Sequence, residues 1–305
     1  MVPTISNGVW PTMITPFTAD DRLDDSALAA MVDWYSVRGV AGLFAVCQSS
    51  EMFHLNLAER VSLARKVVEL VAGRVGVIAS GHISDKLTAQ IDEVTQIAET
   101  GVDAVVLVTN RFAREGESDE IWKRNVERFL TAMPADVALG FYECPHPYKR
   151  LLNPDLLAWC AATGRFIFLK DTCCDLGQIE AKLAVAGPIK LFNANAATLL
   201  RSLEAGAAGY SGVMGNFHSQ LYVWLCRHWH RDTAAARRLQ AFLGVSSAIE
   251  ARAYPVCAKY HLQLEGLPLA LHTRTRPASD LIDSFRREVV QLRQLTAEYG
   301  ETYAR

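Results

Sequence analysis

The sequence predicts a (β/α)8 barrel, the α/β fold also called a TIM barrel, with a C-terminal helical extension. Short runs of β-branched and apolar residues alternate with longer segments of helical periodicity. The runs recur roughly every 25 to 30 residues, which is the length of one β-α unit. Eight such runs precede a long helical segment at the C-terminus, and eight parallel β-α units close into a barrel.

The predicted strands are short and almost continuously apolar, which is typical of parallel strands that are buried on both faces. A helical pattern separates each strand from the next, as parallel pairing requires. The eight strands are predicted at residues 9–16, 40–47, 75–80, 104–109, 137–142, 166–170, 189–192 and 207–213. We therefore expect the carboxyl ends of all eight strands to meet at one end of the barrel.

The segments between the strands begin and end at residues that favour helix termini. Asp24 precedes a predicted helix at residues 26–38, and Asn56 can cap a second helix at residues 57–71. Pro154 stands in the first turn of another predicted helix, where its missing N–H costs least. Further helices are predicted at residues 84–100, 118–133 and 154–163.

Beyond the eighth strand the alternation of strand and helix stops. The remaining residues have almost wholly helical character, with breaks near Gly244, residues 266–268 and Pro277. We expect residues 1–218 to form the barrel and residues 219–305 to form a helical extension packed on it, within one functional domain. Barrel folds commonly use about 250 residues as a single unit, so the length of this chain does not require two domains.

The composition excludes several classes of partner. The formal net charge is -2 at pH 7 and the basic residues are spread along the chain, which argues against nucleic acids and membrane surfaces. The longest apolar stretches are far shorter than the ~20 residues that a membrane span requires, and residues 1–7 lack a signal-peptide pattern. We expect a cytoplasmic protein that binds a small neutral or anionic metabolite.

The cysteines do not indicate a disulfide framework or a zinc site. There are 7 of them, an odd number, and no two are spaced as in a C-x-x-C pair. Cys173 and Cys174 are adjacent and can be interpreted as a redox pair, although free cysteine is more often a small buried apolar residue. We expect reduced thiols and no bound metal.

Lys170 is the strongest single indication of chemistry. It ends an apolar strand, and in a barrel of this kind the reactive groups gather at the carboxyl ends of the strands. An ammonium held against apolar walls loses solvation, so its pKa falls and the neutral amine can attack a ketone. The alternative interpretation is a lysine that reaches solvent or pairs with Asp171.

Other polar residues follow the remaining strands. Tyr142 ends the fifth strand, before a proline-rich turn that would fix its phenol, and a positioned phenol can transfer protons. Plain packing is the alternative for this ring. Hydroxyls and N–H groups after the second strand suit a substrate carboxylate, unless the loop is only a capped turn. The candidate substrate-binding residues are Gln48, Ser49, Ser50, Arg111 and Gly212.

Five short motifs follow one another along nearly the whole chain. They are GVWPTMITPF at 8–17, CQSSEM at 47–52, LAER at 57–60, YECP at 142–145 and FLKD at 168–171. Together they resemble the dihydrodipicolinate synthase and N-acetylneuraminate lyase family of Schiff-base-forming, class I enzymes. The resemblance implies a barrel, assembly as a homotetramer or dimer, and independence from metal and organic cofactors.

The resemblance also implies a role for individual residues. Lys170 looks like the Schiff-base lysine of the family, and Tyr142 looks like its proton-transfer tyrosine. Ser49 falls on the second hydroxyl of the carboxylate-binding pair, whereas Gln48 replaces the first. We therefore expect an altered pocket for the carboxylate of a 2-oxo acid.

Two departures concern the second substrate. Phe112 stands where the synthases of the family have a second tyrosine, which relays protons from a neighbouring subunit. Pro147 stands where they have an arginine that holds the carboxylate of the aldehyde substrate. On these grounds we do not expect a true dihydrodipicolinate synthase.

We expect a class I aldolase or lyase that acts on pyruvate or another 2-oxo acid, together with an aldehyde or its aldol adduct. Two close alternatives are dihydrodipicolinate synthase proper and a hydratase-aldolase that uses the same lysine, for which Arg111 and His82 are the residues to examine. An alternative of another class is a non-catalytic sensor that binds a 2-oxo acid without turning it over, because a fold alone never guarantees activity.

Overall fold

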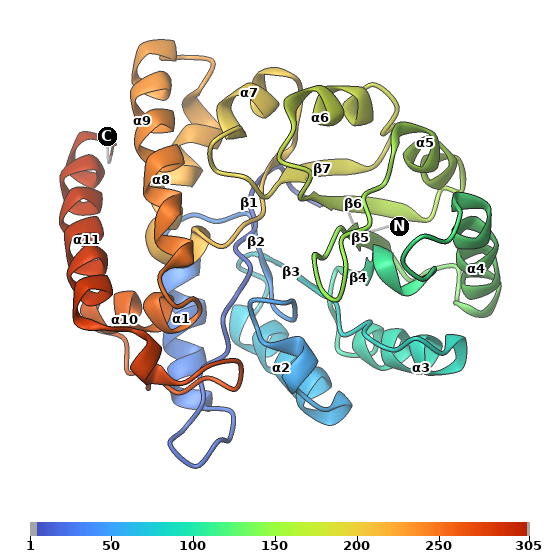
Figure 1. Ribbon diagram of the computed structural model, residues 1–305, viewed down its shortest axis with the longest axis horizontal. Coiled ribbons are helices and arrows are strands. Elements are labelled where there is room, and N and C mark those ends of the chain that lie inside the picture. The colour runs from blue at the N-terminus through green and yellow to red at the C-terminus, as the bar shows by residue number, and fades with distance from the viewer. Residues whose placement is uncertain (1–4, 304–305) are drawn as a thin grey trace.

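Eight parallel strands form the centre of the molecule and helices surround them (Figure 1). The computed structural model describes residues 5–303. Neighbouring strands are hydrogen-bonded in the order β1-β8-β7-β6-β5-β4-β3-β2, which confirms the predicted barrel. The strands are β1 Gly8–Val9, β2 Gly42–Phe44, β3 Gly76–Ala79, β4 Ala104–Val108, β5 Leu139–Tyr142, β6 Phe166–Asp171, β7 Lys190–Asn193 and β8 Gly209–Tyr210.

The first strand is shorter than the sequence predicts. It covers Gly8–Val9 rather than residues 9–16, because Pro11 has no N–H to donate to a neighbouring strand. The chain nevertheless stays beside β2 after Pro11. The Phe44 N–H donates to the Pro11 carbonyl, and the Met13 N–H donates to the Phe44 carbonyl, at 3.0 Å each. These bonds close the barrel between its first and second strands.

Aromatic rings fill the interior of the barrel. Trp10 lies edge-on to Phe168 and to Phe192, with ring centroids 6.2 Å apart in both pairs, and Phe168 stacks on Phe192 at 4.8 Å. Only glycine leaves room for the indole, because a Cβ at Gly42 would lie 2.1 Å from it. Phe168 and Lys170 are two residues apart on β6, so their side chains point to the same face. Lys170 therefore lies above an apolar, aromatic layer.

Most helices begin where the sequence predicts. The side chains of Asp24 and Asn56 accept backbone N–H groups at the starts of α1 and α2, and Asn56 also forms a capping box. By contrast, α3 starts at Leu87 rather than at residue 84, because the Ser84 N–H donates to the Glu93 carboxylate at 3.1 Å. The helices around the barrel are α1 Asp25–Val37, α2 Leu57–Val71, α3 Leu87–Ala98, α4 Asp119–Ala132, α5 Pro154–Ala162, α6 Leu176–Leu183, α7 Leu199–Glu204 and α8 Gly215–His228.

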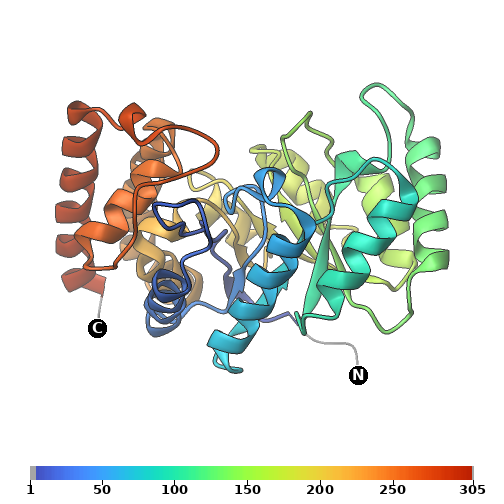
Figure 2. The ribbon, with the colours of Figure 1, turned by 90° about the horizontal axis from the view of Figure 1, so that it is seen from below.

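The C-terminal helices stack on one side of the barrel, next to α8 and α1 (Figure 1). They are α9 Thr233–Ser246, the 3-10 helix η3 Ser247–Ala251, α10 Val256–Leu264 and α11 Asp283–Tyr303. The chain between α10 and α11 arches towards the barrel (Figure 2). Within residues 5–303, no helix combines the length and the apolar character that crossing a bilayer requires.

Two details of this region bear on the expected boundaries. Helix α9 continues through Gly244 and ends at Ser246, shortly after the break expected near Gly244. Helix α8 begins at Gly215 and has non-helical backbone angles at His218, next to the expected division between residues 218 and 219.

Candidate active site

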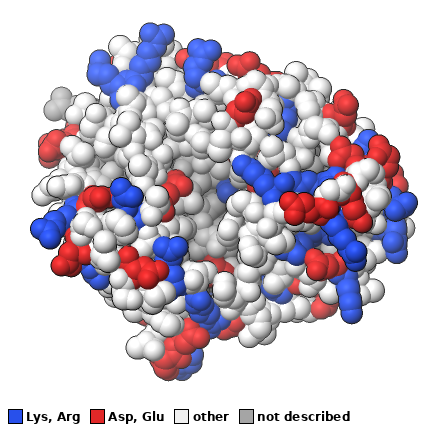
Figure 3. All heavy atoms as spheres, in the orientation of Figure 1, with Lys and Arg blue, Asp and Glu red and all other residues white. Residues whose placement is uncertain are grey.

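A cavity of about 420 Å³ opens at the carboxyl ends of the strands. Its walls come from the loop after β2, from the ends of β5, β6 and β8, and from the C-terminal extension. Figure 3 shows this face hollowed near its centre, with most charged side chains around the rim. The cavity therefore lies at the end of the barrel where the sequence predicts the reactive groups.

Lys170 is a buried amine in this cavity. It lies opposite Tyr142 in the β5–β6 register, and its Nζ is 4.0 Å from the centroid of the Tyr142 ring. Burial lowers the pKa of Lys170 below its ordinary value, and the nearby Cys47, Cys144 and Glu250 oppose that shift only in part. A larger fraction of this amine is therefore neutral, and nucleophilic, than in a lysine exposed to water.

Asp171 does not pair with Lys170. Its carboxylate lies 2.6 Å from the Nζ of Lys182, which is also 2.6 Å from the carboxylate of Glu143. All three side chains are buried, and burial together with the charge of Asp171 raises the pKa of Glu143 to about 7. The structure thus excludes the interpretation of Lys170 as the partner of Asp171.

The phenol of Tyr142 has a defined acceptor. Its hydroxyl donates to the Oε1 of Gln48 at 3.2 Å, and the thiol of Cys144 lies 3.6 Å from the same oxygen. Burial raises the pKa of Tyr142 well above its ordinary value, so the phenol is protonated at neutral pH. Gln48 thus orients this phenol.

The two serines after β2 have different surroundings. Ser49 lines the cavity, and its hydroxyl donates to the Oγ1 of Thr12 at 3.1 Å. Ser50 is fully buried outside the cavity, where its Oγ lies 2.7 Å from the carbonyl oxygen of Ala45 and 2.8 Å from that of Met13. Ser49 and Lys170 therefore line the same cavity, whereas Ser50 holds the loop in place.

Gly212 and Arg111 also differ in position. Gly212 lines the cavity, and a Cβ there would lie 2.4 Å from the Oη of Tyr210, so a larger residue does not fit. Arg111 lies in a neighbouring cavity with Phe112 and Pro147, and its guanidinium pairs with Asp85 at 2.9 Å. Arg111 is therefore not among the described residues, 5–303, that line the cavity of Lys170.

His82 lies in the protein core. It is fully buried, its Nδ1 accepts the Val108 N–H at 3.0 Å, and its ring packs on Phe112 with centroids 4.9 Å apart. Burial lowers the pKa of His82 to about 3, so the imidazole is neutral. Neither of the residues singled out for a hydratase-aldolase lines the cavity.

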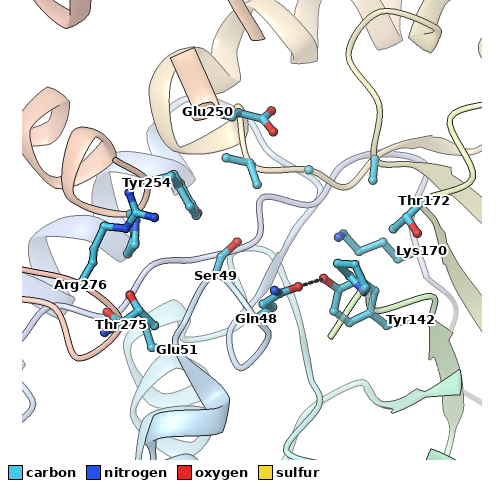
Figure 4. A pocket seen from close by; sticks show the side chains of 15 residues that line it. Gln48, Ser49, Glu51, Tyr142, Lys170, Thr172, Glu250, Tyr254, Thr275 and Arg276 are labelled. Atoms are coloured by element: carbon cyan, nitrogen blue, oxygen red, sulfur yellow. Dashed lines mark hydrogen bonds between the residues drawn. The ribbon is translucent and has the colours of Figure 1, made fainter. Parts of the chain in front are cut away.

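The C-terminal extension supplies residues that the sequence analysis missed. Glu250, Tyr254 and Arg276 line the cavity, as Figure 4 shows, across from Lys170 and Tyr142. They come from η3 and from the chain that flanks α10, where no strand end marks them. A prediction from strand ends cannot find such residues, because packing of distant segments alone brings them to the barrel.

Glu51 fixes part of this extension over the barrel. Its Oε2 accepts the N–H of Arg274 at 2.6 Å and the N–H of Thr275 at 2.8 Å. The guanidinium of Arg274 in turn donates to Glu59 at 2.8 Å and to Asp21 at 3.0 Å. These bonds hold residues 274–276 at the mouth of the cavity.

The chain is similar to proteins of known sequence and structure. It is 28% identical over 265 residues to a 4-hydroxy-tetrahydrodipicolinate synthase of Thioalkalivibrio sulfidiphilus, covering 86% of this chain and 88% of the relative. It is 27% identical over 277 residues to YjhH of Escherichia coli, a probable 2-dehydro-3-deoxy-D-pentonate aldolase, with the same two coverages of 86% and 88%.

Solved structures show the same fold. YagE of Escherichia coli K12, solved in complex with pyruvate, superposes with a TM-score of 0.86 at 24% identity, over 95% of this chain and 98% of that one. A dihydrodipicolinate synthase of Bacillus anthracis gives a TM-score of 0.86 at 21% identity, over 95% and 98% of the two chains. A model of the dihydrodipicolinate synthetase family matches residues 5–295. The chain belongs to this dihydrodipicolinate synthetase family.

Proposed function

We propose that this protein is a class I aldolase or lyase in which Lys170 forms an imine with pyruvate or a similar 2-oxo acid. The observation that carries the proposal is the buried amine of Lys170, 4.0 Å from the ring of Tyr142 at the mouth of the barrel. Family membership supports the enzyme class, and the name of the YjhH relative supports an aldolase. No observation favours a hydratase-aldolase or a sensor.

Binding would begin with the carboxylate of the 2-oxo acid. The Ser49 hydroxyl and the backbone N–H groups of its loop are suited to hold that carboxylate, and Gly212 leaves space for it beside β8. The carboxylate placed there would direct the neighbouring ketone towards Lys170. The neutral amine then attacks the ketone carbon and forms a carbinolamine.

Proton transfer follows. The protonated phenol of Tyr142 is suited to donate to the carbinolamine hydroxyl, which leaves as water and gives the iminium. The iminium draws electrons from the bond between C3 and C4 of an aldol adduct, so that bond breaks and an enamine and an aldehyde form. In the opposite direction the enamine attacks an aldehyde. Both directions need the covalent nitrogen, because a non-covalent ammonium offers no comparable electron sink.

Borohydride trapping tests the proposal. Reduction of the imine leaves a stable secondary amine, so we expect borohydride with pyruvate to attach the acid irreversibly to the peptide that contains Lys170, as read by mass spectrometry. A Lys170→Met variant should give no adduct, whereas Lys190→Met, which alters a lysine outside the cavity, should react like the wild type. An adduct on another peptide, or none with a broad panel of 2-oxo acids, would overturn the proposal.

We also propose that the barrel and the C-terminal extension act as one functional unit, because Glu250, Tyr254 and Arg276 complete the cavity. Assembly as a homotetramer or dimer, a cytoplasmic location and independence from cofactors stay predictions of the sequence. The mass of the assembly in solution can be measured by light scattering.

A further inference from the structure

Arg276 is a cation in the cavity with no assigned task. It stands in the chain between α10 and α11, and Figure 4 shows it next to Tyr254, across the cavity from Lys170. Its side chain is half-buried, and among residues 5–303 its guanidinium forms no hydrogen bond and no ion pair. A guanidinium in a protein keeps its proton, so Arg276 brings a permanent positive charge to the cavity.

The backbone of Arg276 is held in place. Its N–H donates to the Oγ1 of Thr273 at 3.3 Å, and the Thr273 hydroxyl donates to its carbonyl oxygen at 2.6 Å. Glu51 binds the N–H groups of the two preceding residues. The guanidinium of Arg274, by contrast, is bonded to two carboxylates of the protein. The same short segment thus uses one arginine to fasten itself to the barrel and presents the other to the cavity.

The carboxylates of Glu51 and Glu250 also line the cavity, but neither pairs with Arg276. The Oε2 of Glu51 accepts two backbone N–H groups, and its Oε1 lies 3.9 Å from the Nζ of Lys259. Burial raises the pKa of Glu250 to about 7, and the charge that acts on this group is that of Lys170. An anion that enters the cavity therefore meets a guanidinium that has no partner among residues 5–303.

The 2-oxo acid does not account for this cation. Its carboxylate has its proposed place at Ser49 and Gly212, beside the strands of the barrel, whereas Arg276 comes from the extension. At roughly 30 Å³ for each water-sized group, the six heavy atoms of pyruvate fill less than half of the cavity of about 420 Å³. The remaining space, which the extension bounds, is left for the second substrate.

We infer that Arg276 determines specificity for the second substrate: its guanidinium binds a carboxylate or phosphate of the aldehyde, at the end remote from the reacting carbonyl group. The inference rests on the proposed imine at Lys170. The fork of N–H groups on a guanidinium fits either anion with two hydrogen bonds at once. Aspartate semialdehyde is a separate case, because its ammonium stands on the same carbon as its carboxylate and would lie against the guanidinium.

The test uses pairs of aldehydes that differ only in the anionic group. Succinic semialdehyde is paired with butanal, and glyceraldehyde 3-phosphate is paired with glyceraldehyde. Condensation of each aldehyde with pyruvate gives kcat/KM for the wild type, Arg276→Met and Arg276→Lys. Exchange of the pyruvate methyl protons for deuterium, followed by NMR, reports the imine and enamine without any aldehyde. The matched control is Arg293→Met, which removes a guanidinium that pairs with Glu265 on the surface of the extension.

We expect the wild type to prefer the charged member of at least one pair, and the pair concerned tells a carboxylate site from a phosphate site. Arg276→Met should lower kcat/KM for that charged aldehyde about 10- to 100-fold, as the loss of a charge-assisted hydrogen bond does, and leave its neutral partner within about threefold. Arg276→Lys should recover part of the loss, because it keeps the charge but not the fork. Methyl exchange should stay within about threefold in both variants, because Lys170 and Tyr142 remain.

Several results would overturn the inference. These are a wild type that exchanges pyruvate protons but condenses with neither charged aldehyde, or prefers neither to its neutral partner, and an equal loss for charged and neutral aldehydes in Arg276→Met. An equal loss in Arg293→Met counts against it too. A comparable loss of methyl exchange in Arg276→Met would mean that the guanidinium serves the 2-oxo acid. Failure of the wild type both to exchange pyruvate protons and to be trapped by borohydride would overturn the proposed function instead.

Discussion

Lys170 and Tyr142 are each followed directly by a carboxylate that points away from the cavity. Glu143 and Asp171 share the ammonium of Lys182, with both distances at 2.6 Å. The N–H of Thr172 also donates to Glu143 at 3.0 Å. This buried cluster ties the ends of β5 and β6 to α6, so the side chains of Lys170 and Tyr142 are held in a fixed relation from behind.

The first prediction at this scale concerns the phenol. Tyr142→Phe should slow turnover by about 10² to 10⁴-fold, because one positioned proton donor is lost. The fold should be unchanged, since the ring keeps its edge contact with Phe44, whose centroid lies 5.9 Å away. Steady-state kinetics and circular dichroism measure both effects. Wild-type turnover would show that water or another group carries the proton.

The second prediction concerns specificity. We expect little turnover of pyruvate with aspartate semialdehyde, because Phe112 is packed in the core and neither Pro147 nor Arg111 lines the cavity. Loss of a charged hydrogen bond to a desolvated carboxylate costs about 2 to 5 kcal/mol, which corresponds to at least a ~30-fold deficit relative to the true substrate. A coupled assay for dihydrodipicolinate formation measures it. Robust turnover would instead point to Arg276, whose guanidinium lines the cavity.

At the scale of elements, the sequence predicted which residues stand at the ends of the strands. It could not predict which loop side chains and which residues of the extension lie beside them. The alternation of apolar runs placed Lys170, Tyr142 and Ser49 at one end of the barrel, because parallel strands must share that end. It could not show that the Arg111 side chain turns to Asp85, since the direction of a loop side chain depends on its neighbours in space. The residues of the extension were missed for the same reason.

The family motifs carried more of the prediction than periodicity did. They identified the dihydrodipicolinate synthetase family, which is confirmed, whereas the link to N-acetylneuraminate lyases stays a prediction. They did not reveal how Gln48 works, because a motif reports which residue type is replaced and not what the new side chain contacts. The hydrogen bond from Tyr142 to Gln48 became visible only in the folded chain.

The prediction for the elements concerns the segment that Glu51 holds. Arg274→Ala removes its bonds to Glu59 and Asp21, so residues 274–276 should lie less firmly over the cavity. Ordering the segment upon binding would cost about 1 to 2 kcal/mol, which raises the KM roughly 5- to 30-fold. Arg293→Ala is the matched control, because Arg293 pairs with Glu265 away from the cavity. An equal change in both variants would contradict the prediction.

At the scale of the whole molecule, the carboxyl of Glu250, which lines the cavity, reduces stability as the pH rises. The pKa of Glu250 rises from the ordinary value of 4.5 to about 7 on folding. Below pH 4.5 the group is protonated in both states and folding is not penalised. As the pH rises from 4.5 through 7, only the unfolded chain readily loses the proton, so stability falls, and above pH 7 the loss is complete.

Replacement of Glu250 should therefore stabilise the protein in a pH-dependent manner. We expect Glu250→Gln to increase the free energy of unfolding by about 1 to 3 kcal/mol at pH 8 and by much less at pH 4.5, with residual exposure to water reducing the effect. Chemical denaturation at the two pH values measures it. A variant less stable than the wild type at pH 8 would show that the carboxylate makes a stabilising contact.

The manner in which Glu51 holds the extension bears on how such a cavity can diversify. The carboxylate binds the backbone N–H groups of Arg274 and Thr275, not the side chains that the segment presents to the cavity. A substitution at Arg276 therefore leaves the anchor intact. Mutational drift or a laboratory library can therefore exchange this side chain while the tether persists. If the proposed function holds, single codon changes at this position can give new aldehyde preferences.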